Sequence, residues 1–208
     1  LSELGDDRAV LLVQFFPDFG AARLFGRWIG IARRVGVMGI IVPGVETPEQ
    51  ALKLVRSMRY PPQRVTKPAL REPAGYRGWA PLVAIPYWGL TQDEYAAKAD
   101  LWPLSPDGEL MAIAMIESPE AIKNIRQILA VPGLSAILIG QGDLSMSLGV
   151  GNPGASQLHP EVEAEVAKVA QACVEMKKLC GSYQGDVKTR LAQGFRRSEE
   201  HTSELQSR

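Results

Sequence analysis

The sequence predicts an α/β fold in which helices cover a parallel sheet, and it favours a barrel over an open doubly wound sheet. Short, continuous apolar runs rich in β-branched residues alternate with segments of helical periodicity, the pattern of strands buried on both faces. The chain also passes from strand to helix in the same way twice, at residues 46–49 and 117–120, each reading acid, hydroxyl residue, proline, acid. Repetition of that unit favours the barrel.

The first clear unit is a strand over residues 37–42 followed by a helix. Thr47 is placed to cap the helix, and Pro48 suits its first position. Gln50, three residues after the cap, completes a capping box. We expect this helix to end near Met58.

The second unit is a strand over residues 111–116 with a helix behind it. Ser118 is the expected cap and Pro119 the first helical residue, and apolar residues three and four apart continue to Leu129. The third unit is expected to begin with a strand at 135–139, a tight loop at 140–142 and a helical turn at 143–148. A long helix should then run from Pro160 to residues 180–181.

The two cysteines, Cys173 and Cys180, fall within that predicted long helix. Seven helical residues separate them by roughly 10.5 Å along the axis, beyond the ~7 Å limit for a disulfide. We therefore predict two buried thiols in the core. Neither has a further Cys or His pair at the spacing of a metal site.

Length and composition restrict the class of protein. A chain of 208 residues suits one sizeable domain, and equal numbers of basic and acidic residues, 23 of each, give no basic excess for nucleic acid or anionic lipid. No apolar run approaches the ~20 residues of a membrane span. The N-terminus lacks the pattern of a secretion signal, so we expect a cytoplasmic protein without membrane contact. Residues 61–110, rich in proline and aromatics, are expected to form a long arm, either a lid or interface segment or a plain surface excursion.

The candidate functional residues are two carboxylates, each of which follows a predicted strand. Because the carboxyl ends of parallel strands meet at one rim, Glu117 and Asp143 should point at the same spot. Two such oxygens suit Mg²⁺ or Mn²⁺, with open positions through which a 2-oxo acid could chelate the ion. The loop at 140–142 could offer backbone N–H groups to the substrate carboxylate. On spacing alone, the alternative remains that both acids are strand-end polar residues and Asp143 only caps a turn.

Several motifs, in order along the chain, resemble the HpcH/HpaI aldolase and citrate lyase family, and the resemblance spans about residues 36–195. The motifs are residues 36–43, Arg59-Tyr60-Pro61-Pro62, Arg77-Gly78-Trp79, Ile116-Glu117, residues 140–145, Gly151-Asn152-Pro153 and His159-Pro160.

This resemblance implies a TIM (β/α)8 barrel of the phosphoenolpyruvate/pyruvate-binding type. It implies Glu117 and Asp143 as ligands of a divalent metal (Mg²⁺, Mn²⁺ or Co²⁺), with Gln141, Gly142 and Asp143 against bound pyruvate. The implied reaction is cleavage of 4-hydroxy-2-oxo acids to pyruvate and an aldehyde, or the reverse addition, through a metal-stabilised pyruvate enolate, usually in a homo-oligomer. Alternatives are an acyl-CoA lyase of the citrate lyase β type and a non-catalytic remnant serving as an oligomerisation module.

The chain also departs from the family pattern. Residues 1–35 contain no histidine, so the family's catalytic histidine and its substrate-binding arginine are not assigned to any residue, and the origin of this segment stays open. Gln141 replaces the usual proline of the loop, and Met115 stands where glutamine is common.

The family pattern makes the strand that begins near Val37 the fourth of the barrel. We therefore expect strands four to six and part of the seventh, without the first three or the eighth. A substitute strand is expected within residues 10–16. Residues 196–208 are expected to be a disordered, artefactual tail, because residues 197–207 read like a translated sequencing adapter. We accordingly expect a truncated barrel with reduced activity.

Overall fold

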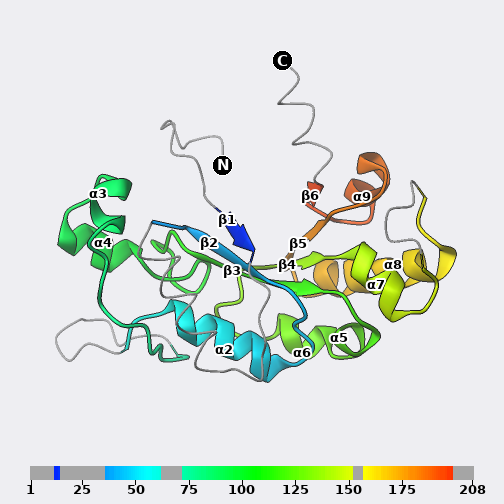
Figure 1. Cartoon of the computed structure of the whole chain (residues 1–208), viewed down its shortest axis with the longest axis horizontal. Coiled ribbons are helices and arrows are strands. Elements are labelled where there is room, and N and C mark those ends of the chain that lie inside the picture. Colours follow the sequence, from blue (N-terminus) through cyan, green and yellow to red (C-terminus); the bar gives the residue numbers. More distant parts are fainter. Residues whose placement is uncertain (1–11, 15–35, 62–71, 152–156, 199–208) are drawn as a thin grey trace, which may run out of the picture.

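Six parallel strands follow one another in chain order across one sheet of the computed structural model, which describes residues 12–14, 36–61, 72–151 and 157–198 (Figure 1). The strands are β1 (Leu12–Gln14), β2 (Gly39–Val42), β3 (Met111–Ile116), β4 (Ala136–Ile139), β5 (Leu179–Ser182) and β6 (Arg197–Ser198). The helices are α2 (Pro48–Met58), α3 (Ala84–Trp88), α4 (Gln92–Lys98), α5 (Pro119–Lys123), α6 (Ile125–Leu129), α7 (Gln141–Ser147), α8 (Pro160–Glu175) and α9 (Val187–Ala192).

The strand order decides between the two architectures that the periodicity of the sequence allows. A doubly wound sheet reverses its strand order and places helices on both faces. Here the order runs β1 to β6 without reversal, and α2, α5 and α6 lie along the same side of the sheet (Figure 1). The sheet is therefore an arc of a barrel. Within the described residues, no pairing joins β1 to β6, so the arc stays open.

The two faces of the sheet carry different cores. Alternate strand residues such as Ile40, Ala114 and Ile137 pack with the helices in one large buried cluster. The residues between them point to the inner face of the arc. They form a small second cluster of Ile41, Ile113, Met115 and Leu138.

Several elements have the bounds that local sequence signals predict. The α2 helix runs from Pro48 to Met58 as expected, and the capping box between Thr47 and Gln50 is present in both directions. The β3 strand has its predicted bounds, and the Ser118 side chain accepts the N–H of Ala121 at the start of α5. Elsewhere the bounds shift. The expected helix after Pro119 is divided into α5 and α6 at Asn124, and α7 begins two residues earlier than the predicted turn at 143.

The prediction for the end of the long helix is wrong. The α8 helix ends at Glu175, Lys177 takes a left-handed conformation with φ 54°, and the chain turns back as β5. Cys173 of α8 and Cys180 of β5 consequently face one another, with Cα atoms 6.3 Å apart, and form a disulfide. The expectation of two free thiols was derived from helical spacing, which does not hold across this turn.

The described part of the 61–110 arm contains two short helices, α3 and α4. An ion pair ties the arm to the end of α2. The buried Arg59 guanidinium donates to both carboxylate oxygens of Asp100, from Nε at 2.7 Å and from Nη2 at 2.8 Å. Trp88 of α3 also donates its indole N–H to the carbonyl of Gly36, at 2.8 Å.

The two ends of the sheet include segments that the sequence left uncertain. The β1 strand lies within the substitute strand expected at 10–16 and pairs with β2. Two strands, β5 and β6, follow β4, so the arc extends beyond the partial seventh strand that was expected. Of the tail predicted at 196–208, Arg197 and Ser198 pair with β5, and residues 199–208 lie outside the described residues. None of the helices in the described ranges is long and apolar enough to cross a membrane.

Candidate active site

Glu117 lies directly after β3, and its side chain occupies the space between the ends of the two neighbouring strands. Its Oε2 accepts the backbone N–H of Gly44, which follows β2, at 2.9 Å. On the other side it packs against Gly140, which follows β4, so closely that a Cβ on Gly140 would lie 2.8 Å from Glu117 Cγ. Strand register explains this position, since Ile116 pairs directly with Ile139.

Asp143 is the third residue of α7, and it lies close enough to Glu117 to affect its ionisation. The pKa of Glu117 is raised to about 7, chiefly by burial and to a smaller extent by the negative charge of Asp143 and a hydrogen bond between the two carboxyl groups. The Gly44 N–H opposes this shift because it stabilises the ionised form. The structure thus brings together the two carboxylates that the sequence placed at the same rim.

The donor atoms of this pair fit a hard divalent cation. Two carboxyl groups that hold a proton near neutral pH offer a site where a dication can replace that proton. In the parts of the chain that the structure describes, no group of three or more His, Cys, Asp or Glu side chains could hold a metal. The pair would offer a dication two carboxylate ligands and leave further positions for water or substrate, the arrangement that Mg²⁺ prefers.

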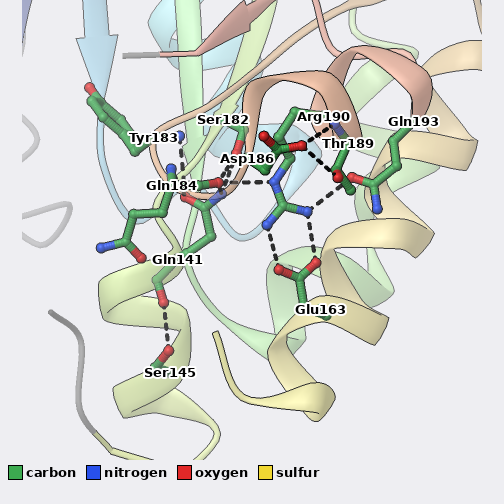
Figure 2. Close-up of polar contacts among 10 residues, drawn as sticks. All are labelled: Gln141, Ser145, Glu163, Ser182, Tyr183, Gln184, Asp186, Thr189, Arg190 and Gln193. Atoms are coloured by element: carbon green, nitrogen blue, oxygen red, sulfur yellow. Dashed lines mark hydrogen bonds and ion pairs between the residues drawn. The ribbon is translucent and has the colours of Figure 1, made fainter. Parts of the chain in front are cut away.

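The Gln141 side chain does not point to the predicted substrate position. It is completely buried and directed toward the loop after β5 (Figure 2). The amide Nε2 donates to Ser182 Oγ and, at 3.0 Å, to the carbonyl of Gln184. Its Oε1 accepts the N–H groups of Tyr183 and Gln184, at 3.2 and 3.3 Å. This side chain is fully engaged within the protein, so any contact of Gln141 with a substrate has to come from its backbone.

Two parts of the site were not predicted from the sequence: the backbone N–H of Gly44 and the loop at 183–184. The Pro43-Gly44 pair indicated only the end of a strand, whereas the Gly44 N–H contacts the Glu117 carboxylate. Residues 183–184 follow the predicted end of the long helix, and no role was predicted for them, so their contact with Gln141 was not foreseen. Gly142, in the first turn of α7, lies between Gln141 and Asp143 as the sequence order requires.

Comparison with known proteins identifies the family. The profile of the HpcH/HpaI aldolase/citrate lyase family matches residues 25–204. The chain belongs to this family. Among curated relatives, the hydroxypyruvate/pyruvate aldolase of Delftia acidovorans is 38% identical over 154 residues, which are 71% of this chain and 47% of the relative. The 4-hydroxy-2-oxo-heptane-1,7-dioate aldolase of Shigella flexneri is 35% identical over 146 residues, 69% of this chain and 45% of that protein.

Solved structures of HpcH/HpaI proteins share the fold. One from Burkholderia cenocepacia J2315 has a TM-score of 0.65 and 25% identity, and the match covers 94% of this chain and 69% of that one. Another, from Desulfitobacterium hafniense DCB-2, has a TM-score of 0.64 and 24% identity, and the match covers 94% and 69%. The chain spans about half the length of the curated relatives it matches.

In this family member, Gly140→Ala is expected to leave the fold intact and to displace the Glu117 carboxylate. Gly140 has a φ of −95°, which alanine adopts readily, but the new methyl group would overlap the Glu117 side chain. A flexible side chain can move aside, so the free energy of unfolding should change by no more than about 1 kcal/mol. Mn²⁺ affinity, measured by electron paramagnetic resonance, should fall by about tenfold.

Gly78→Ala is the matched control for this substitution. No heavy atom would lie within 4 Å of a Cβ at Gly78, and its φ is not in the left-handed region. The control should therefore leave both stability and Mn²⁺ affinity unchanged. An unaltered Mn²⁺ affinity in Gly140→Ala would show that the Glu117 carboxylate does not need its present position.

Proposed function

We propose that this chain carries the metal-binding rim of a divalent-metal-dependent carbon–carbon lyase. The reaction is cleavage of a 4-hydroxy-2-oxo acid to pyruvate and an aldehyde, or the reverse addition. The observation that supports it most directly is the apposition of Glu117 and Asp143 at the ends of adjacent strands, with the Glu117 pKa raised to about 7. Relatives at 35% and 38% identity are named as aldolases of a hydroxy-oxo acid and of hydroxypyruvate and pyruvate, which supports the same class.

In this proposal, one set of residues would bind the metal and another would bind the substrate carboxylate. Glu117 and Asp143 would hold Mg²⁺ or Mn²⁺, and the bound dication would supply a Lewis acid for the ketone oxygen of the 2-oxo acid. The substrate carboxylate would lie at the first turn of α7, where the backbone N–H groups of Gln141, Gly142 and Asp143 have no partner within the helix. The buried Gln141 side chain would keep that turn in place.

Direct Mn²⁺ binding tests the proposal without requiring turnover. The chain should bind Mn²⁺, and Glu117→Gln and Asp143→Asn should each weaken binding by more than about tenfold, because each removes one of two charged ligands. Pyruvate release from a 4-hydroxy-2-oxo acid, measured by coupling to lactate dehydrogenase, should require added Mn²⁺ or Mg²⁺. It should be lost in the same two variants.

Glu46→Gln provides the control carboxylate. Glu46 also follows a strand, but its carboxylate accepts the Ser118 hydroxyl at 2.6 Å. This variant should retain the Mn²⁺ affinity of the unsubstituted chain. The metal site is refuted if the unsubstituted chain binds no Mn²⁺, or if Glu117→Gln and Asp143→Asn bind Mn²⁺ with the same affinity as Glu46→Gln. The chain is then better described as a non-catalytic remnant.

A further inference from the structure

Arg190 of α9 is a buried cation whose guanidinium group connects three parts of the molecule (Figure 2). Only 1% of the side chain is exposed. Its two terminal nitrogens donate to the two carboxylate oxygens of Glu163 on α8, at 2.7 and 2.6 Å. Nη1 also donates to Gln193 Oε1 at 2.9 Å, and Nε donates to the backbone carbonyl of Gln184 at 2.9 Å. Arg190 thereby joins α8 and α9 to the loop after β5.

The Gln184 carbonyl is the point at which this network meets the buried amide of Gln141. That one oxygen accepts Arg190 Nε at 2.9 Å, Gln141 Nε2 at 3.0 Å and Ser182 Oγ at 2.9 Å. The other end of the Gln141 amide accepts the N–H groups of Tyr183 and Gln184. The Gln141 side chain is therefore held at both ends by a loop whose own position depends on Arg190.

Gln141 is the first residue of α7, so its side chain sets where the first turn of that helix lies. Asp143 is two residues further along the same turn, and Gly140, the residue before Gln141, packs against Glu117. We propose that Arg190 is a positioning residue for the Glu117–Asp143 pair, acting through the loop carbonyl and Gln141. This inference rests on the proposed function, because it assigns Arg190 to the geometry of the proposed metal site.

The surroundings of Arg190 fit a planar guanidinium and not merely a positive charge. Its fork binds a carboxylate through two nitrogens while Nε remains free to reach the carbonyl, which a lysine ammonium cannot reproduce. Gly185 lies directly against it, since a Cβ there would be 2.7 Å from Arg190 Cζ. The φ of Gly185 is +106°, a conformation that residues with a side chain rarely adopt. The loop is thus built closely around the guanidinium group.

The test compares Arg190→Lys with Arg59→Lys, a matched change at another ion pair whose arginine is buried. Arg59 is 2% exposed and also makes a two-bonded pair with a carboxylate, but in the arm and with Asp100. Arg190→Lys should weaken Mn²⁺ binding by about tenfold, the usual effect of altering a group that orients a metal ligand. It should also accelerate amide hydrogen exchange in α7 (Gln141–Ser147). Arg59→Lys should leave both quantities unchanged while it accelerates exchange at the end of α2.

Each outcome of this comparison decides the matter. Unchanged Mn²⁺ affinity and unchanged exchange in α7 for Arg190→Lys would overturn the proposal. Equal weakening of Mn²⁺ binding in the two lysine variants, in proportion to their loss of stability, would also overturn it, since the effect would be general. Failure of the unsubstituted chain to bind Mn²⁺ would refute the proposed metal site itself. The exchange rates in α7 would then still decide whether Arg190 positions that helix.

Discussion

Mn²⁺ affinity is expected to fall by about tenfold for each pH unit well below 7, and so by about 50-fold between pH 7 and pH 5. The reason is the pKa of Glu117, which is raised to about 7 by burial and by the nearby charge of Asp143. Below that pKa a proton occupies the carboxylate and competes with the cation. Above pH 7 the affinity should be nearly constant. A glutamate with the ordinary pKa of 4.5 would instead keep its affinity down to about pH 5. Isothermal titration at several pH values gives the profile directly.

The Glu117 carboxyl group should make the metal-free protein less stable as pH rises, whereas an ordinary ion-paired acid makes a protein more stable as pH rises. The folded pKa of Glu117 is above its unfolded value of 4.5, so the folded state retains a proton between pH 4.5 and 7 that the unfolded state has lost. The contribution of Glu117 to stability is therefore full below pH 4.5 and is lost as pH rises through 7. Added Mn²⁺ should restore stability at pH 8, because it binds the ionised folded form.

Two variants separate Glu117 from the other titrating groups. In the metal-free protein, the free energy of unfolding should fall as pH rises toward 7 and then level off, which gives a break in the profile near pH 7. Glu117→Gln should remove that break. Asp143→Asn should move that break to lower pH, because it removes the neighbouring charge that helps to raise the Glu117 pKa. A break near pH 7 that persists in Glu117→Gln would assign the titration to another group.

Local sequence signals were sufficient for the elements that lead into the site. The bounds of α2 were predicted because Thr47, Pro48 and Gln50 together specify a helix start. The bounds of β3 were predicted because an apolar run ends where Glu117 begins the next loop. Since these signals lie within a few residues of each other, they also predicted that the Glu117 carboxylate would lie at the strand-end rim.

The end of α8 could not be predicted in the same way. Apolar residues continue at helical spacing to Met176, and Cys180 fits the same period, although the helix ends at Glu175. The residue that turns the chain is Lys177, in a left-handed conformation that is usually signalled by glycine or asparagine. With no such residue at the turn, β5 was read as a continuation of the helix. The disulfide between Cys173 and Cys180 was excluded for the same reason.

The role of the Gln141 side chain was not predicted, because the long helix was expected to continue into the residues that form β5. The hydrogen-bond partners of that side chain include Tyr183 and Gln184, more than 40 residues away in sequence, on the loop that follows β5. The sequence predicted a tight loop at 140–142, whereas Gln141 is the first residue of α7. Contacts that depend on the pairing of distant strands are decided by tertiary structure, and no local pattern reports them.

Loss of the Asp100 carboxylate is expected to be among the most destabilising single changes in the described part of the chain. Arg59 is 2% exposed, and both Asp100 oxygens accept hydrogen bonds from its guanidinium. Asp100 Oδ1 also accepts the N–H of Leu101 at 2.8 Å, at the point where the arm returns toward β3. Asp100→Ala should lower the free energy of unfolding by about 3–5 kcal/mol, because it removes the carboxylate that binds two nitrogens of a buried guanidinium. The midpoint of urea denaturation measures the change.

Glu109→Gln tests whether burial, and not the mere presence of an ion pair, produces this cost. Glu109 pairs with Lys98 in the same arm at 2.5 Å, but the two side chains are 24% and 39% exposed. Water and salt screen such a pair, so its removal should cost no more than about 1 kcal/mol. Similar small losses in both variants would mean that solvent reaches Arg59 when Asp100 is removed. Since a domain of this size is stable by only about 5–15 kcal/mol, the larger loss would remove a substantial part of the total stability.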